Sequence, residues 1–215
     1  MGLLVIARVV DVMGGSVPDL LVRPERPEDV EAIRDVNRAA FLDHPFSRQT
    51  EHLIVDALRC AGALRLSLVA VSDGRVVGHV AFSPARVGDS AEGWVLLGPI
   101  AVLPQLQRRG IGSALVTAGL KRLREAGSSG CVLVGDARFY SRFGFQPLPG
   151  LAYEGVAAEH VLGLAFGDAE PTGRIVAHEA FEVEPEADAK RAPGSALDER
   201  GHRRRAPGED RAEPR

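Results

Sequence analysis

The chain contains very little cysteine. Its 215 residues include two, Cys60 and Cys131, and these form no Cys-x-x-Cys pair. Disulfide-rich domains carry more cysteines at regular spacings, so the sequence excludes a disulfide framework and favours a reducing, cytoplasmic compartment. The six histidines are scattered and match no zinc-ligand spacing, so no metal site is expected.

The chain also lacks a strong charge of one sign and a long hydrophobic run. The formal net charge of -3 provides no basic field for DNA or RNA, so no nucleic-acid partner is expected. The apolar run Leu3–Ala7 is too short for a signal peptide, and Arg8 and Asp11 interrupt the apolar residues after it. No stretch approaches the length of a transmembrane helix, so no membrane partner is expected.

Composition divides the chain into three parts. Residues 1–18 form a flexible extension, residues 19–184 have the hydrophobic content of one domain, and residues 185–215 alternate charges with Pro and Gly. A segment of that last kind cannot bury enough apolar surface to offset its ordering entropy, so we expect a disordered tail. Arg203–Arg205 could alternatively form a nucleic-acid arm, but the interleaved acidic residues favour a solvated tail.

Hydrophobic periodicity within residues 19–184 predicts an α/β fold, with a mixed sheet and helices on both faces. Ser72–Arg75 contains Asp-Gly and predicts a hairpin turn between two strands. Helices are predicted from Pro27 to about Ala40 and over Thr50–Cys60, Gln107–Gly127 and Ala137–Phe143. Strands are predicted over Leu20–Arg23, Leu66–Val71, Val76–Val87, Trp94–Val102, Cys131–Val134, Val161–Phe166 and Arg174–His178.

A glycine pair marks the expected start of the third helix. Gly110 and Gly112 follow two arginines, Arg108 and Arg109. A helix N-terminus presents unpaired N–H groups and the positive end of the dipole, and glycine lets an anion approach the backbone. The segment is neither a Walker loop nor a complete dinucleotide fingerprint. It can therefore bind a pyrophosphate or be an ordinary glycine-capped turn.

The strand before this loop carries Gly98-Pro99 among apolar residues. Proline cannot donate to a ladder and glycine weakens one, so the pair predicts a bulge or an opening in the sheet. Backbone groups freed there could pair with an extended ligand that carries amides, such as pantetheine. The alternative is an ordinary edge strand.

Gln107-Arg108-Arg109-Gly110-Ile111-Gly112 resembles the Q-x-x-G-x-G acyl-CoA signature of the GNAT superfamily of N-acetyltransferases. Tyr140–Phe145 resembles the Y-x-x-x-G-F element of that family, Gly78–Pro84 its third strand, and Arg23–Phe41 its first strand and helix. The resemblance covers roughly Leu20–Val183. It implies a GNAT-like, mostly antiparallel sheet with a splayed parallel strand pair, flanked by helices, and acetyl-CoA as co-substrate.

The resemblance also implies where acetyl-CoA binds. Ile100 and Val102 would offer backbone groups to pantetheine, the loop Gln107–Ser113 would surround the pyrophosphate, and Tyr140 would lie near the thioester sulfur. The expected binding residues are Ile100, Ala101, Val102, Gln107, Arg108, Arg109, Gly110, Ile111, Gly112, Ser113, Asp136 and Tyr140. Many relatives have Asn after the fifth strand, where this chain has Gly135-Asp136.

Amine acetylation needs a general base and an acid for the leaving thiolate. Tyr140 is the candidate acid, because a phenol with a pKa of about 10 is close enough to a thiol of about 8.5. The alternative is a structural phenol beside Phe139 and Phe143. Some relatives carry a glutamate base near the position of Leu96, which cannot do this work, so the nearest carboxylate, Glu92, is the candidate base. His79, His44 and a water chain remain alternatives.

The predicted function is transfer of an acetyl group from acetyl-CoA to a primary amine of a small molecule or protein. The predicted assembly is a monomer or homodimer. The alternative is a binding module that senses acetyl-CoA without catalysis. Acceptor contacts are expected in segments 41–50 and 146–160.

Overall fold

The computed structural model describes residues 19–44, 47–88, 91–168 and 171–184, with the backbone alone for Ala91 and Glu92. The predicted extension, residues 1–18, and the predicted tail, residues 185–215, lie outside the described residues, so both remain predictions. Within the described residues, no helix is long and apolar enough to span a membrane.

A mixed sheet runs through the centre of the domain. The strands are β1 (Leu21–Pro24), β2 (Leu66–Ser72), β3 (Arg75–Val87), β4 (Ala91–Val102), β5 (Gly130–Val134), β6 (Gln146–Pro147) and β8 (Val161–Ala165). Their spatial order is β1-β2-β3-β4-β5-β8-β6. β4 and β5 are parallel, and the other neighbours along this path are antiparallel. The predicted sheet is thereby confirmed.

Two very short strands were not predicted from the sequence. β6 and β7 (Leu151–Ala152) each have two residues, too few to show a period. β7 pairs in parallel with β9 (Gly173–Val176), and β9 pairs antiparallel with the end of β3 at Arg86 and Val87. The chain after β8 therefore returns to the sheet's central hairpin.

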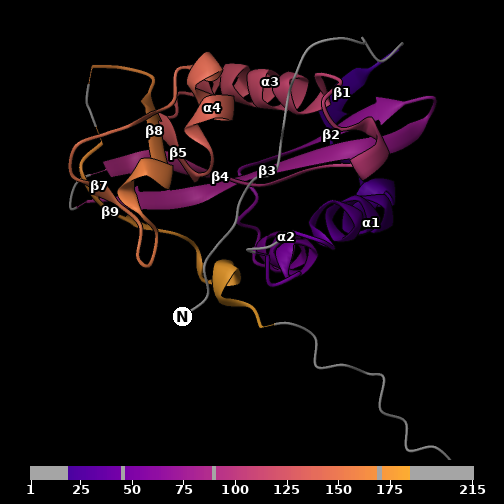
Figure 1. The fold of residues 1–215 in the computed structure, drawn as a ribbon, viewed down its shortest axis with the longest axis horizontal. Helices are drawn as coiled ribbons and strands as arrows, with labels where there is room; N and C mark the ends of the chain where they lie inside the picture. Colours follow the sequence, from indigo (N-terminus) through magenta and orange to yellow (C-terminus); the bar gives the residue numbers. More distant parts are fainter. Residues whose placement is uncertain (1–18, 45–46, 89–90, 169–170, 185–215) are drawn as a thin grey trace, which may run out of the picture. The chain divides into compact units, whose positions relative to one another are not determined.

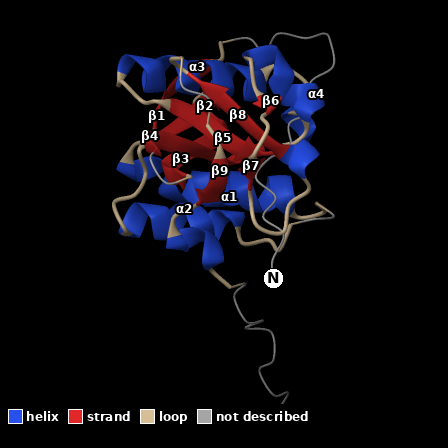
Figure 2. Ribbon diagram, turned by 90° about the vertical axis from the view of Figure 1, so that its left-hand side faces the viewer, coloured by secondary structure: helices blue, strands red, loops and turns tan. Residues whose placement is uncertain are grey.

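Helices cover both faces of the sheet (Figures 1 and 2). α1 (Val30–Phe41) and α2 (Glu51–Cys60) lie on one face, and α3 (Ile111–Glu125) lies on the other with the short α4 (Ala137–Tyr140). Acidic residues Glu28 and Asp29 follow Pro27 in a 3-10 turn before α1, as the favourable charge at a helix N-terminus predicts.

Apolar side chains fill both layers between helices and sheet. On one face, Ile33 of α1 and Val55 of α2 pack on Val69 and Ala81 of β2 and β3. On the other face, Leu115 and Leu120 of α3 join a larger cluster with Phe82 and Leu97. A Cβ atom on Gly119 would lie 2.3 Å from Cζ of Phe82, so α3 can pack this closely only with glycine there. Alternating residues of one strand thus serve opposite layers.

The predicted start of α3 at Gln107 is wrong, because the helix begins at Ile111. Pro104–Leu106 form a 3-10 turn, and the backbone then has positive φ at Arg108 (64°) and Gly110 (81°), which no α-helix contains. The C-terminal stop is confirmed. Gly127 has a φ of 73°, and its N–H and that of Ser128 bond to the carbonyls of Arg124 and Leu123, each at 3.0 Å.

Candidate active site

The parallel strands β4 and β5 part within the sheet. Their pairing covers Trp94↔Gly130, Val95↔Cys131 and Leu96↔Val132, and it ends there. β4 continues to Val102 beside β3, while the last residues of β5, Leu133 and Val134, pair with β8. The backbone of β4 beyond Leu96 therefore has a ladder partner on its β3 side alone. β4 is a central strand, so the edge-strand alternative is excluded.

A bulge lies where the strands part. Val80 pairs with Ile100 and Phe82 with Leu97, so the single residue Ala81 lies opposite the dipeptide Gly98-Pro99. This confirms the bulge that the Gly-Pro pair predicted. An extra residue bends a strand and interrupts its ladder, which re-aims the following backbone groups.

The loop after β4 has a backbone geometry that suits an anion. Backbone in which residues of opposite hand follow one another turns successive N–H groups toward one side, and Arg108 and Gly110 supply the left-handed positions. The first bond within α3 runs from the N–H of Ala114 to the carbonyl of Gly110, at 2.9 Å. The N–H groups of Ile111 and Gly112, at the first two positions of the helix, therefore have no acceptor within it. Positive φ at an arginine is uncommon and costs about 1–2 kcal/mol, a strain typical of functional loops.

The side chain of Gln107 ties this loop to the end of β4. Its Nε2 donates to the carbonyl oxygen of Val102 at 3.1 Å. The loop and the bulged strand are thus joined by a side-chain bond as well as by the chain between them. Arg108 and Arg109 are exposed beside the loop and add positive charge there.

Asp136 follows β5 and caps α4. Its Oδ1 accepts from the backbone N–H of Arg138 at 2.9 Å, and its carboxylate also accepts from the guanidinium, Nη2 to Oδ2 at 2.7 Å. The hydrogen bonds from Arg138 hold the pKa of Asp136 below its ordinary value. The carboxylate is therefore already used by its own helix, which leaves the backbone of Gly135-Asp136 as the group nearest to the expected ligand contact.

Tyr140 lies fully buried at the end of α4, with its ring between Phe139 and Phe145. The ring centroids are 4.8 Å and 5.7 Å away, in edge-on arrangements. Its hydroxyl has no hydrogen-bond partner among the described residues. A buried hydroxyl without a partner costs free energy, so it calls for an explanation such as a missing ligand. Burial also raises the pKa of Tyr140, so the phenol keeps its proton.

Cys131 of β5 lies close to both the parting strands and the phenol. Cys131, Leu97 of β4 and Tyr140 belong to one buried apolar cluster. Burial raises the pKa of Cys131, so the thiol stays neutral. The cluster joins Tyr140 to Leu97, the first residue of β4 beyond its pairing with β5, although the two are 43 residues apart in the sequence.

The structure places the candidate bases Glu92 and His44 in different surroundings. Glu92 is the second residue of β4, but its side chain lies outside the described part of the structure, so its role stays a prediction. The ring of His44 packs on Phe41, with centroids 5.8 Å apart. Among the described residues, no group of His, Cys, Asp and Glu side chains could hold a metal ion.

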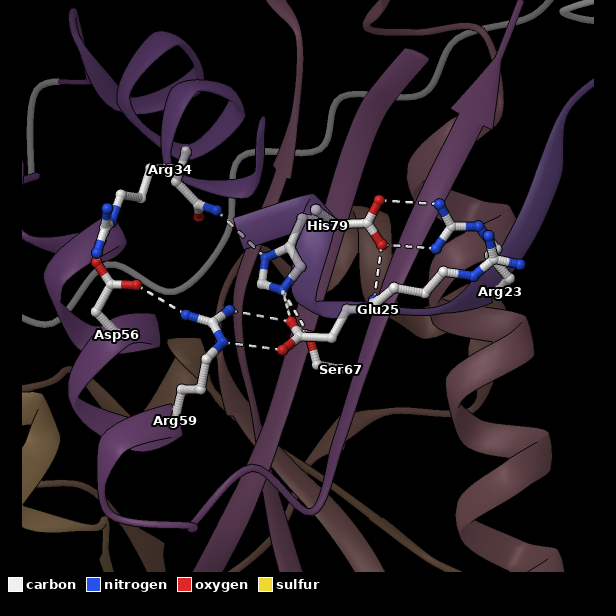
Figure 3. Close-up of polar contacts among 10 residues, drawn as sticks. Arg23, Glu25, Arg34, Asp56, Arg59, Ser67 and His79 are labelled. Atoms are coloured by element: carbon white, nitrogen blue, oxygen red, sulfur yellow. Dashed lines mark hydrogen bonds and ion pairs between the residues drawn. The ribbon is translucent and has the colours of Figure 1, made fainter. Parts of the chain in front are cut away.

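His79 lies in a buried hydrogen-bonded network (Figure 3). Its Nδ1 lies 3.2 Å from Nδ2 of Asn37, and its Nε2 lies 2.9 Å from Oγ of Ser67. The amide of Asn37 can only donate there, so His79 carries its proton on Nε2 and donates to Ser67. Burial lowers the pKa of His79 to about 4. Both ring nitrogens have hydrogen-bond partners within the protein, so the arrangement favours a structural role for His79 over the role of general base.

The network continues to the surface through Glu25. The hydroxyl of Ser67 donates to the carboxylate of Glu25, which also accepts from Nε of Arg59 at 2.9 Å. Arg59 reaches Asp56 at 2.8 Å, and Asp56 accepts from Arg34 of α1 at 2.6 Å (Figure 3). Sequence reasoning missed this network, because its members come from five separate segments and no local spacing connects them.

Comparisons with known proteins agree with this geometry. The sequence profile of the acetyltransferase (GNAT) family matches residues 30–145. The N-acetyltransferase YhbS of Escherichia coli K12 is 40% identical over 128 residues, which are 59% of this chain and 74% of YhbS. Another Escherichia coli N-acetyltransferase, YjhQ, is 34% identical over 125 residues, 57% of this chain and 67% of YjhQ.

Solved structures show the same fold. A GNAT family acetyltransferase from Brucella melitensis, in complex with acetyl-CoA, is 48% identical with a TM-score of 0.67, over 75% of this chain and 97% of that protein. YhbS in complex with CoA is 33% identical with a TM-score of 0.70, over 76% of this chain and 92% of YhbS. The chain therefore belongs to the acetyltransferase (GNAT) family, as an acyl-CoA-dependent N-acetyltransferase.

Proposed function

We propose that the chain transfers the acetyl group of acetyl-CoA to a primary amine of a small molecule or protein, with Tyr140 as the general acid. The observation that carries this proposal is the buried, unpartnered hydroxyl of Tyr140 beside the parting strands. A phenol placed there needs a polar partner that the described residues do not supply. The sulfur of a bound thioester is the partner that the family chemistry provides.

The residues at the C-terminal end of β4 and in the loop after it fit acetyl-CoA. The left-handed turn at Arg108 and Gly110, with the backbone N–H groups of Ile111 and Gly112 at the start of α3, suits a pyrophosphate. The backbone of Ile100, Ala101 and Val102, which lacks a β5 partner, suits the amides of pantetheine. Bound acetyl-CoA supplies the activated acetyl group.

The chain's own groups would then act on charge and protons. Backbone N–H groups at the bulge can stabilise the oxyanion that forms when an amine attacks the carbonyl. Because burial raises the pKa of Tyr140, the phenol is protonated at neutral pH and can donate as negative charge develops on the leaving sulfur. Glu92, or a water molecule, is proposed to take the proton of the amine.

The acceptor is proposed to lie between segments 41–50 and 146–160. Tyr153 in the second segment packs on the cluster that contains Leu96 and Val134, the residues that flank the opening on the face of α1 and α2. A cytoplasmic location is proposed because acetyl-CoA is supplied there and both cysteines are free.

An acceptor screen tests the function. The full chain is incubated with acetyl-CoA and a panel of polyamines, amino acid amides and peptides with free amino groups, and release of the CoA thiol is measured. We expect turnover with at least one amine and none with its N-acetylated form, which is the matched control. Tight acetyl-CoA binding without any transfer would favour the sensor alternative.

A further inference from the structure

Glu51 carries a buried carboxylate near the start of α2. It begins α2, and the residue is 4% exposed. Its carboxylate accepts from the hydroxyl of Ser47, which lies 2.7 Å from Oε1 and 2.8 Å from Oε2. No ion pair joins it to a Lys, Arg or His of the described residues, and burial raises the pKa of its carboxyl. The hydroxyl of Ser47 and the backbone N–H of Glu51 itself donate to this carboxylate, and neither carries the positive charge that would offset its desolvation.

The other buried acidic side chains on this side of the sheet are paired. Asp29 is 5% exposed and binds Arg23 at 2.6 Å, and the partly buried Glu25 binds Arg59 at 2.9 Å. Asp56, further along α2, binds Arg34 at 2.6 Å. Among the residues that the structure describes, each of these carboxylates has an arginine partner and Glu51 has none. A structural role for Glu51 would not require this exception.

The position of Glu51 places it under α2, toward the sheet. Val55 lies one helical turn later on the same face and packs on Val69 and Ala81. α2 also contacts β4, the strand that carries the bulge, and the 3-10 segment Glu179–Glu182. Phe181 of that segment packs in the same cluster as Leu96 and Tyr153. The face that holds Glu51 is therefore the face on which the strands open and the proposed acceptor segment packs.

Ser83 is a second buried polar residue on this face. It lies two residues after Ala81 on β3, so both side chains point to the side of α2. Ser83 pairs with Leu96, which pairs with Val132 in the last row before the strands part. The residue is fully buried, and its hydroxyl has no hydrogen-bond partner among the described residues.

We propose that Glu51 is the acceptor-side carboxylate of the enzyme: it binds the ammonium group of the acceptor amine and takes its proton, while the hydroxyl of Ser83 hydrogen-bonds the acceptor or a water beside it. This inference rests on the proposed transfer to an amine, and it makes Glu51 the competitor of Glu92 for the role of base. It commits the acceptor to carry a positive charge when it binds.

The proton balance is simple. The ammonium N–H gives its proton to a carboxylate oxygen of Glu51, and the freed lone pair forms the N–C bond to the acetyl carbon. The C–S bond breaks, and the sulfur takes a proton from Tyr140. The proton on Glu51 leaves to solvent, and a second amine proton lost after attack restores Tyr140. A carboxyl with a raised pKa suits this exchange near neutral pH.

Glu51→Gln tests the proposal, with exposed Glu125→Gln as the matched control. With an amine that the wild type acetylates, E51Q should lower kcat/KM for the amine by about 10²-fold or more, the lower range for lost acid–base catalysis. The acetyl-CoA Kd should stay unchanged, and the melting temperature should hold or rise, because an unpaired buried charge is removed. E125Q should leave all of these unchanged.

A second variant and a second measurement extend the test. Ser83→Ala should raise KM for the amine several-fold without loss of stability, and it replaces E51Q if that variant fails to fold. Full amine turnover in E51Q, or loss of turnover in E92Q alone, would overturn the role of Glu51 and leave the acetyltransferase intact. If the wild type acetylates no amine, melting curves in ethylammonium chloride are compared with curves in sodium chloride. A rise in the melting temperature of the wild type that is absent in E51Q (or S83A) supports the site. Equal rises in the wild type and the variant reject it.

Discussion

A Cβ atom on Gly135 would lie 2.6 Å from Cε2 of Tyr140, so the phenol ring rests directly on the backbone that follows β5. The contact gives a physical reason for glycine next to Asp136 in this chain. The ring of Tyr140 is thus positioned by backbone on one side and by Phe139 and Phe145 on others.

Gly135→Ala should therefore displace the phenol. The added methyl group forces the ring or the backbone to move, at a cost of about 1–3 kcal/mol in the free energy of unfolding. Thermal or denaturant unfolding measures this loss, and kcat should fall with it. Gly167→Ala is the matched control, because a Cβ there meets nothing within 4 Å. Equal stability of the two variants would show that the ring does not pack on Gly135.

Tyr140→Phe separates catalysis from packing. The hydroxyl has no partner among the described residues, so its removal should leave the melting temperature unchanged or slightly higher. If the phenol protonates the leaving sulfur, kcat should fall by roughly 10²-fold while KM for acetyl-CoA hardly changes. Steady-state kinetics on an acetylated amine checks this. Full kcat in the variant would assign Tyr140 to packing alone.

Gly112→Asp should weaken acetyl-CoA binding. The change puts a side chain and a negative charge at the second residue of α3, beside N–H groups that have no acceptor in the helix. We expect calorimetry to show at least a tenfold loss of affinity, about 1.4 kcal/mol. Because Gly112 is buried, a circular dichroism spectrum and melting curve must first show that the variant folds. A folded variant with wild-type affinity would place the pyrophosphate elsewhere.

The buried His79 predicts a dependence of stability on pH. Its pKa falls from the ordinary 6.5 to about 4 on folding, so the folded state holds the neutral ring and the unfolded state binds a proton first. The contribution of the neutral His79 to the free energy of unfolding is complete above a pH of about 6.5 and is lost as the pH falls toward 4. Over this range the free energy of unfolding changes by up to about 1.36 kcal/mol per pH unit, which corresponds to roughly one proton. His79→Gln should flatten this slope, and the exposed His160→Gln should not. Parallel slopes in denaturant titrations at pH 7, 6 and 5 would contradict the prediction.

The C-terminal segment should be dispensable. Truncation after Glu184 keeps the ion pair between Arg48 and Glu184 and removes the residues whose mixed charge predicts disorder. The melting temperature and the acetyl-CoA Kd should stay within error of the full chain. A loss of several degrees would show that residues 185–215 pack on the domain.

Local chemistry made much of this fold predictable. The Asp-Gly turn at Ser72–Arg75 and the bulge at Gly98-Pro99 both depend on single residues, and the structure confirms both. The glycines identified the predicted acyl-CoA loop, but they did not predict its backbone conformation. Gln107 reads as a good helix former, and only the left-handed turn at Arg108 and the bond from Gln107 to Val102 show why the helix starts later.

Long-range contacts were not predictable. His79 is a candidate base by sequence because nothing in its strand shows that Asn37 and Ser67 occupy both ring nitrogens. Glu51 has the sequence position of an ordinary first-turn acid in an amphipathic helix, because its burial depends on how α2 packs on the sheet. Periodicity identifies the face of a helix that is buried, but not which carboxylate will lack an arginine.

The bond from Gln107 to Val102 fixes the length of strand between the opening in the sheet and the loop before α3. The strand separates from β5 after Leu96 and is fastened to that loop at Val102, six residues later. At about 3.3 Å per residue, the two ends are roughly 20 Å apart. A donor that uses both ends must span that length, as a nucleotide with a pantetheine arm can. A short acetyl donor such as acetyl phosphate reaches one end only, so donor choice follows from the length of a strand rather than from the shape of a pocket.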